Sequence, residues 1–278
     1  MKTSQLLLIS LVSFSIVSCK PNPPVEQKSA SSMPSKSVAT STNKPADCEF
    51  TLGFDAWEPY QYQDIGDQVS GLDIELVEAV VTEMGCRLTF KQGTWVSLLA
   101  DLKHGEVDIL LGASKTEARE EFALFSDAYR TEEFSLYIRK DDDTRAAYTS
   151  LSEFVQNNSK IGIIGDYYYG PEVTILLEGS ATSSSFVNAM MTEINVARLL
   201  DSDIDAFIED TFVGATLIRR KALSNYIVAQ GITFQTGNAY VMFSKTSVSP
   251  EQLADFNLEL SKIKDGPLYQ SIFEKYTF

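Results

Sequence analysis

From residue 47 onward, hydrophobic and polar residues follow two different periodicities, one typical of strands and one typical of helices. Every second residue from Phe50 to Phe54 is apolar, which predicts a strand. Residues 72–84 instead carry apolar side chains at helical spacing, and Gly85 follows where the end of a helix needs a positive φ. The same succession predicts three more elements: a strand at 87–90, a helix at 95–104 and a strand at 107–111. Strands separated by helices indicate a parallel sheet covered by helices.

The second half of the chain repeats this succession. Residues 134–139 alternate as a strand, and the acidic residues 141–143 are expected in a solvated turn. The later elements are expected as a strand at 160–164, a helix around 173–177, strands at 204–208 and 241–244, and helices at 250–263 and 266–276. Each half supplies about four strands, too few for one sheet in a domain of this length. We therefore expect an α/β fold with two lobes.

The first 46 residues show neither the strand periodicity nor the helix periodicity. An apolar run at residues 6–17 is within the length of a signal-peptide core and too short for a membrane-spanning helix of about 20 residues. The run ends at Ser18 and Cys19, which resembles the bacterial lipobox. Residues 1–18 would then be a signal peptide, and Cys19 would carry lipid. The alternative is a plain secretory signal beside a coincidental cysteine.

Residues 19–46 are expected to form a disordered tether. They are rich in Ser, Pro, Thr and Lys, with no apolar periodicity that could bury a core. With a lipidated Cys19, such a tether would hold the rest of the chain to a membrane on its periplasmic or extracytoplasmic side.

The part of the chain after the tether is strongly acidic. The whole sequence has 23 basic and 38 acidic side chains, and residues 47–278 keep 18 and 37 of them, a formal charge of −19. So negative a surface argues against nucleic acid or an anionic membrane as the partner. It does not identify a ligand, because net charge mainly affects solubility.

Two cysteines remain after Cys19. Cys48 and Cys86 would be an even pair in an oxidising compartment, which favours a disulfide. Each opens a predicted strand, so the two would lie side by side if those strands are parallel neighbours. Two buried free thiols are the alternative.

Several segments, in order, resemble the family 3 extracytoplasmic solute-binding proteins, the polar amino-acid receptors of bacterial import systems. The strongest is GASKTEAR at 112–119, followed by FSDAY at 125–129. The other similar segments are WEPY at 57–60, GLDIEL at 71–76, WVSLL at 95–99, residues 102–108 and residues 265–276. The resemblance covers nearly everything from Asp47 to Phe278.

The resemblance implies a periplasmic-binding-protein type II fold, in which two crossing strands join two α/β lobes. The crossings would fall near Leu136 and Tyr240. Lobe 1 would combine residues 47–135 and 241–278, and lobe 2 would be residues 136–240. A ligand would be enclosed when the hinge closes, and the protein is expected to be a monomer.

The resemblance also implies the residues of a zwitterion site. Arg119 would clamp the ligand's α-carboxylate, since a guanidinium offers two parallel donors to a planar carboxylate. Ser114 would donate its hydroxyl to the same carboxylate, and Gly112, preceded by Leu111, would expose its backbone to the ligand. Asp210 would receive the α-ammonium from the other lobe. Each could instead have a structural role: a surface arginine, a glycine at a strand end, or a surface carboxylate.

Aromatic residues would form the walls of the pocket. Trp57 and Trp95 match the family's ligand-packing positions, although large aromatic residues are more often part of a core. One loop departs from the family pattern, because tyrosines occupy 167–169 where small residues let backbone amides approach the carboxylate. Tyr168 and its neighbours would form an added aromatic clamp, or they would alter or abolish amino-acid binding.

Three functions remain open from the sequence. The chain could deliver a ligand to an ABC-type membrane permease, or it could present its closed form to a membrane sensor. An enzyme of the dehydratase type is a weaker alternative, with Glu58 or Glu209 as a general acid. The only histidine, His104, stands before Gly105 where a helix is expected to end. No nucleophile–base pair or metal cluster is recognisable, so we expect no catalytic activity and no cofactor.

Overall fold

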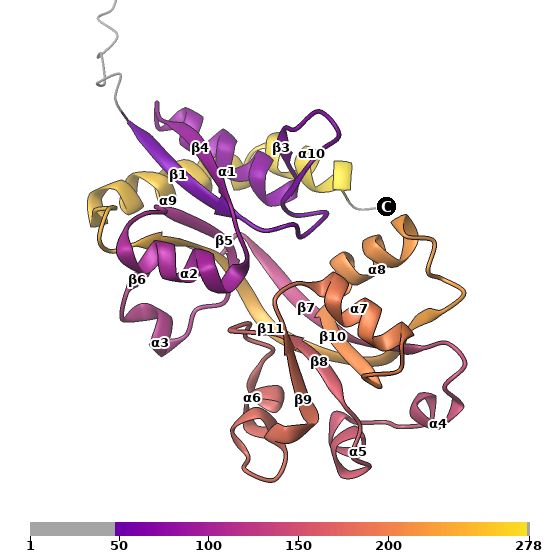
Figure 1. Ribbon diagram of the computed structural model, residues 1–278. Coiled ribbons are helices and arrows are strands. Elements are labelled where there is room, and N and C mark those ends of the chain that lie inside the picture. Colours follow the sequence, from indigo (N-terminus) through magenta and orange to yellow (C-terminus); the bar gives the residue numbers. More distant parts are fainter. Residues whose placement is uncertain (1–47, 277–278) are drawn as a thin grey trace, which may run out of the picture. The chain divides into compact units, whose positions relative to one another are not determined.

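The computed structural model describes residues 48–276 (Figure 1). The strands are β1 Glu49–Phe54, β2 Tyr62–Gln63, β3 Val69–Ser70, β4 Arg87–Gln92, β5 Ile109–Ala113, β6 Ala123–Phe125, β7 Arg130–Arg139, β8 Ile161–Ile164, β9 Phe186–Ala189, β10 Ala206–Asp210 and β11 Ile227–Ser244. The α-helices are α1 Leu72–Glu83, α2 Trp95–His104, α3 Glu117–Glu120, α4 Asp143–Ala146, α5 Leu151–Gln156, α6 Pro171–Glu178, α7 Thr192–Leu200, α8 Thr211–Arg220, α9 Pro250–Lys264 and α10 Pro267–Tyr276.

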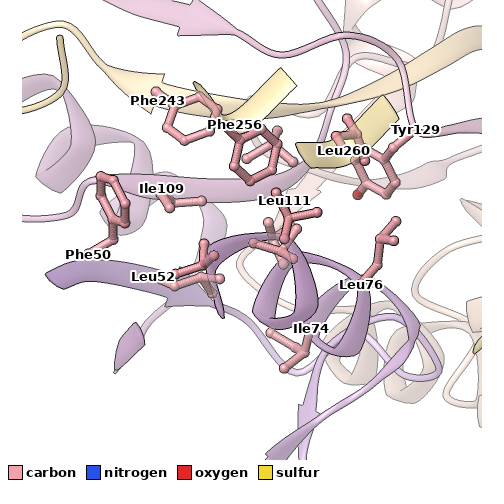
Figure 2. Packing of buried hydrophobic residues seen from close by; sticks show 14 of the residues in the cluster. Phe50, Leu52, Ile74, Leu76, Ile109, Leu111, Tyr129, Phe243, Phe256 and Leu260 are labelled. Carbon is pink, nitrogen blue, oxygen red and sulfur yellow. The ribbon is translucent and has the colours of Figure 1, made fainter. Parts of the chain in front are cut away.

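Lobe 1 is built on strands β4, β1, β5, β11 and β6, of which β4, β1 and β5 run parallel. Side chains alternate between the two faces of β5 because successive residues of a strand point to opposite sides. Ile109 and Leu111 pack with α1 and α9, as Figure 2 shows, whereas Leu110 packs with α2 on the other face. The two faces together give a sheet with helices on both sides.

Lobe 2 is built on strands β7, β10, β8 and β9, with β7 also pairing with β11. The alternation is the same: Ala206 and Ile208 of β10 face one cluster of buried residues, whereas Phe207 faces another that contains residues of α7 and α8. The α/β fold with two lobes predicted from the sequence is therefore confirmed.

Two long strands connect the lobes (Figure 1). β7 and β11 run antiparallel and pair from Arg130–Ala239 to Arg139–Ile227. β11 pairs with β5 and β6 at residues 240–244, and β7 pairs with β10 at residues 134–138. Residues 130–133 and 235–239 lie between these two sets of pairs, with a register shift between Gln235 and Gly237. We propose these two segments as the hinge, close to the predicted positions Leu136 and Tyr240.

The expected elements are found, some with different bounds. Helix 95–104 is confirmed at its predicted bounds, and Gly105 ends it with a φ of 77°. The strand expected at 241–244 is only the end of β11, which begins at residue 227. The strand expected at 134–139 begins four residues earlier, at Arg130. The strands β2, β3, β6 and β9 and the helices α3, α4, α5, α7 and α8 were not predicted.

The expectation of a solvated turn at 141–143 holds for Asp141, which is exposed in a turn, and Asp143 is exposed as well, but it is wrong for Asp142. Asp142 caps the N-terminus of α4 and its side chain is only 9% exposed. It pairs with Arg139 at 3.1 Å and Arg145 at 3.0 Å, and Asp205 joins the same two arginines. Two cations thus hold Asp142 inside the fold.

Cys48 and Cys86 form a disulfide, as predicted, with 4.6 Å between their Cα atoms. β1 and β4 are parallel neighbours, and Glu49 is paired with Arg87 directly after the two cysteines. The bond therefore joins the amino ends of two adjacent strands.

The signal peptide, Cys19 and the tether predicted for residues 1–46 lie outside the described residues. Within residues 48–276, no helix has both the length and the apolar character needed to span a bilayer.

Candidate functional site

A small cavity lies where loops after β1, β4 and β5 meet the loop after β8. Its walls come from both lobes. The lining residues are Asp55, Trp57, Gln61, Trp95, Leu111, Gly112, Ser114, Arg119, Glu132, Phe134, Tyr167 and Tyr168. Seven of the eight residues predicted to bind a ligand are among them, and the eighth, Asp210, is not. The cavity lies at the carboxyl ends of parallel strands, where α/β proteins commonly bind ligands.

Arg119 is buried in this cavity, with 8% of its surface exposed. It belongs to α3, which begins where Thr116 caps the helix. One guanidinium nitrogen donates to the Ser114 carbonyl and another to the Asp166 carbonyl of lobe 2, both at 2.8 Å. Among residues 48–276 no carboxylate lies within ion-pair distance of Arg119. Burial lowers its pKa, so the charge is poorly compensated in this state.

The end of β5 turns sharply beside Arg119. Gly112 has a φ of 64°, a left-handed conformation that side chains rarely adopt. A Cβ there would come within 2.9 Å of the Trp57 ring and 3.0 Å of the Arg130 guanidinium. Glycine is therefore required, and the turn directs the Ser114 side chain into the cavity.

Both predicted tryptophans line the cavity, and each also reaches lobe 2. Trp57 Nε1 donates to Glu209 at 3.0 Å, and Trp95 Nε1 donates to the Asp166 carbonyl at 3.2 Å. The Arg119 guanidinium lies 5.3 Å from the centre of the Trp95 ring, close enough for a cation–π interaction. The two rings are thus walls of the cavity and contacts between the lobes.

The tyrosine loop fills the centre of the cavity. The Tyr167 ring lies edge-on to Trp57, Trp95 and Phe134, with ring centroids 5.8–6.4 Å apart. Tyr168 also lines the cavity, whereas Tyr169 is buried and its hydroxyl accepts a hydrogen bond from the Ile164 amide. Tyr169 is therefore part of the scaffold, and Tyr167 is the residue that occupies the space.

Little empty space remains around Tyr167. About 20 Å³ is open to the centre of a water molecule. A single water needs roughly 10–15 Å³ measured in this way. The cavity therefore holds about one water molecule in this conformation, and an amino acid would not fit beside Tyr167.

Asp210 lies behind the cavity wall. One carboxylate oxygen accepts the Phe212 and Val213 amides at 2.8 and 3.0 Å and so caps α8. The other accepts the Tyr60 hydroxyl of lobe 1 at 3.5 Å. Both oxygens are engaged in this conformation, so the predicted role of Asp210 towards the α-ammonium stays a prediction.

A buried ion pair supports the cavity from the lobe 1 side. Arg130 donates to both oxygens of Asp73, at 3.0 and 3.1 Å, and stacks 3.8 Å from the centre of the Tyr60 ring. Asp73 also accepts the Tyr129 hydroxyl, which in turn accepts the Gly112 amide. This chain of hydrogen bonds fixes the Gly112 turn from behind.

Sequence reasoning missed four cavity residues: Asp55, Gln61, Glu132 and Phe134. Asp55 accepts the backbone amides of Ala56 and Trp95 at 2.7 and 3.2 Å. Glu132 and Phe134 lie on the same face of β7, and both are buried. A strand pattern extended back to residue 130 would have placed an acidic residue on the buried face, which is the signal that could have revealed Glu132.

Among the described residues, five polar contacts join the two lobes across the cleft, in addition to the ring contacts of Tyr167 with Trp57 and Trp95. Four are the hydrogen bonds from Arg119, Trp95, Trp57 and Tyr60 described above. The fifth is an ion pair between Glu58 and Arg220. The two lobes therefore contact each other across the cleft in a closed form, while the Arg119 charge and the Gln61 carbonyl oxygen are left without full compensation among the described residues.

The buried acids of this closed form make stability depend on pH. Burial raises the pKa of Glu209 to about 7 and that of Asp210 to about 8. From about pH 4 to about pH 8 the folded protein thus holds more protons than the unfolded chain, so the free energy of unfolding falls as pH rises. Between pH 5 and pH 8 these two shifts span about 5 pKa units, or about 7 kcal/mol. We therefore expect the melting temperature to drop by at least roughly 10 °C over this range, since each kcal/mol is worth about 2–4 °C.

The variant Asp210→Asn separates this effect from the general repulsion of an acidic protein. Asparagine keeps the helix cap but cannot titrate. Scanning calorimetry should show a smaller drop for this variant than for the wild type. Equal drops would mean that Asp210 is already charged at pH 5.

Comparison with known proteins agrees with this architecture. Residues 50–278 match the bacterial extracellular solute-binding proteins, family 3. The chain is 26% identical over 226 residues to an arginine-binding periplasmic protein of Mannheimia haemolytica, covering 80% of this chain and 87% of that protein. It is 22% identical over 220 residues to a probable histidine-binding protein of Neisseria gonorrhoeae, covering 78% of each.

A solved structure shows the same fold. An ancestral arginine-binding protein bound to arginine superposes with a TM-score of 0.73 at 20% identity, covering 84% of this chain and all of that one. At this identity the likeness shows the fold alone. The family match itself spans nearly all of the described residues, and the chain therefore belongs to the bacterial extracellular solute-binding proteins, family 3.

Proposed function

We propose that the protein binds an amino acid in the cleft between its lobes, with Arg119 holding the α-carboxylate. The observation that carries this proposal is the buried guanidinium of Arg119, which lines the cavity and, within the part of the chain that the structure describes, donates only to neutral carbonyls. A buried cation without a counter-charge is costly. A ligand carboxylate would supply that charge, together with the bidentate geometry that a guanidinium favours.

The ligand's side chain is proposed to be basic. Within residues 48–276, Arg119 is the one cation that lines the cavity, whereas Asp55 and Glu132 are acids. Glu209, which accepts a hydrogen bond from Trp57, is a further buried acid whose pKa of about 7 leaves it partly ionised at neutral pH. An excess of acidic groups around a cleft favours a ligand with additional positive charge. The names of the relatives that bind arginine and histidine support the same class.

Opening of the hinge would admit the ligand. Tyr167 belongs to the loop after β8 in lobe 2, and its ring partners Trp57 and Trp95 belong to lobe 1. Separating the lobes would withdraw Tyr167 from the pocket. Closing over a ligand would then require Tyr167 to take another position, because the space that it leaves in this conformation is too small.

Shortening Tyr167 should therefore strengthen binding. In the variant Tyr167→Ala the ligand no longer displaces a buried ring, whose burial contributes about 1.5–3 kcal/mol to the conformation described above. We expect the dissociation constant for L-arginine to fall by roughly tenfold, measured by isothermal titration calorimetry.

The variant Tyr226→Ala is a suitable control, because this tyrosine is 60% exposed on the surface. It should leave the affinity unchanged. If Tyr167→Ala weakens binding instead, the ring is part of the ligand's own pocket, as an aromatic clamp would be.

Delivery to an ABC-type permease is the proposed role of the closed, loaded form, with the protein anchored outside the cytoplasm through a lipidated Cys19. A membrane sensor that reads the same closed surface is the alternative partner. Detergent phase partition of the wild type and Cys19→Ala tests the anchor: only the wild type should enter the detergent phase. Both forms remaining in water would mean that no lipid is attached.

Binding is proposed to occur without chemical turnover. The two acids considered as general acids already have partners: Glu58 pairs with Arg220, and Glu209 accepts hydrogen bonds from Trp57 and Thr192. Release of a product from an amino acid incubated with the protein would contradict this.

A thermal-shift screen tests the proposed function as a whole. The soluble domain would be heated with each amino acid, with polyamines and with sugars. A ligand present at about 100 times its dissociation constant should stabilise the protein by roughly 2.7 kcal/mol. Stabilisation by basic amino acids supports the proposal. A response to polyamines or sugars alone would show that Arg119 does not bind a carboxylate.

A further inference from the structure

Glu132 is a buried carboxylate that faces the cavity from a strand connecting the lobes. It lies on β7, in the proposed hinge segment, and only 4% of its surface is exposed. Its neighbour across the strand pair is Gly237 of β11. The carboxylate therefore sits at the base of the cleft, where both lobes meet.

The two oxygens of Glu132 differ in their surroundings. Oε2 accepts the Thr236 hydroxyl at 2.9 Å and the Ser114 hydroxyl at 3.4 Å. Oε1 has, within the described part of the chain, only the Arg130 guanidinium 3.8 Å away, beyond hydrogen-bond distance. The protein thus positions Oε2 through hydrogen bonds, whereas Oε1 is free to accept a hydrogen bond from a ligand in the cavity.

Arg130 does not need Glu132 as its counter-charge. The Arg130 guanidinium forms a bidentate pair with Asp73, which is itself fully buried. Arg130 also forms a long ion pair with Glu132 at 3.8 Å, but its hydrogen bonds to a carboxylate go to Asp73. Among the described residues that line the cavity, Arg119 is thus a cation and Glu132 a carboxylate that lack a hydrogen-bonded counter-charge. A zwitterion placed between them would compensate both.

Arg119 and Glu132 both form hydrogen bonds with Ser114. The α-carboxylate and α-ammonium are attached to the same carbon, so the groups that bind them must be neighbours. Ser114 joins the two: its carbonyl accepts Arg119 Nη1 at 2.8 Å, and its hydroxyl donates to Glu132. Asp210, by contrast, uses both oxygens for α8 and Tyr60.

Gln61 provides a second, independent indication that a ligand donates a hydrogen bond in this cavity. Its side chain lines the same cavity and is 4% exposed, yet its buried carbonyl oxygen has no hydrogen-bond partner among the described residues. An unpaired buried acceptor costs about 1–3 kcal/mol. A ligand ammonium has three donors, enough to reach both Gln61 and Glu132.

We propose that Glu132 is the carboxylate that receives the ligand's α-ammonium group, with Gln61 as a second acceptor. This inference rests on the proposed function and assigns the ammonium to β7 rather than to Asp210. Because Ser114, Arg119 and Glu132 all belong to lobe 1 or the connecting strand, the zwitterion can be bound before the lobes close. Residues of lobe 2 would then contact the ligand only when the lobes close.

The test compares L-arginine with desamino-arginine, the guanidino acid that lacks only the α-amino group. Isothermal titration calorimetry would be carried out on the wild type, Glu132→Gln and Asp210→Asn. The wild type should prefer arginine by at least about 30-fold, since losing a partner of a buried charge costs 2–5 kcal/mol. Glu132→Gln should reduce this preference to within about threefold, and Asp210→Asn should retain most of it.

Glu133→Gln is the matched control, because this next residue of β7 bonds to Gln235 instead of the cavity. It should behave as the wild type. Glu132→Asp keeps the charge with a shorter side chain and should retain part of the preference, which guards against misfolding of the glutamine variant.

The outcomes separate the inference from the function on which it rests. If the wild type binds no amino acid, both are wrong. If the wild type binds arginine and Glu132→Gln keeps the full preference for it, the inference alone is wrong. If Asp210→Asn loses the preference instead, the ammonium belongs to Asp210.

Discussion

Replacing Arg119 with alanine is expected to weaken amino-acid binding by at least about 100-fold, or roughly 3 kcal/mol. In this structure the guanidinium donates to two neutral carbonyls. A ligand carboxylate would form charge-assisted hydrogen bonds, which are about twice as strong as neutral ones. The substitution therefore removes more stabilising free energy from the ligand-bound protein than from the protein without ligand. Isothermal titration calorimetry with L-arginine measures the loss.

Two further variants define what Arg119 contributes. Arg119→Lys keeps the positive charge but loses the planar guanidinium that can bind a carboxylate through two hydrogen bonds. We therefore expect the affinity to fall by an intermediate amount, roughly tenfold. Arg87→Ala removes an exposed arginine that pairs with Glu49 far from the cavity, and it should leave the affinity unchanged. Full binding by Arg119→Ala would show that the carboxylate is held elsewhere.

Removing the disulfide is expected to have the largest effect on stability. Cys48 and Cys86 are separated by 38 positions, and closing a loop of this length contributes about 4 kcal/mol on the chain-entropy account. The double variant Cys48→Ser, Cys86→Ser should therefore melt roughly 8–16 °C below the wild type. Differential scanning calorimetry gives the value.

The position of the disulfide predicts what it does not affect. It joins the amino ends of β1 and β4, whereas Asp55, Trp57 and Trp95 follow the carboxyl ends of these strands. The double variant should bind its ligand within about twofold of the wild type when both are folded. Reductant should lower the melting temperature of the wild type only. If removing the disulfide lowers the free energy of unfolding by less than about 1 kcal/mol, the disulfide does little to restrict the unfolded chain.

The parts of the site that could be predicted from the sequence lie in contiguous segments. Residues 111–119 bring Leu111, Gly112, Ser114 and Arg119 together within one strand, one turn and one helical turn, so their grouping follows from local structure. The periodicity of 95–104 and 250–263 likewise reflects helices whose apolar faces are buried.

The remaining parts depend on contacts between distant segments. Tyr167 fills the cavity because lobe 2 closes against Trp57 and Trp95, which no local pattern of the loop contains. Glu132 and Gln61 belong to no motif and meet the cavity through the pairing of β7 and the turn after β1. The first half of β11 was missed because most of its residues are exposed, so it lacks a clear alternation.

The most direct test of the central claim compares L-arginine with agmatine, which is arginine without its carboxylate. Calorimetric titration of the wild-type protein with both compounds should give binding of arginine and an affinity for agmatine at least about 100-fold weaker. A cleft that binds agmatine as tightly as arginine would contradict the account, because the buried guanidinium of Arg119 would then have no carboxylate to bind.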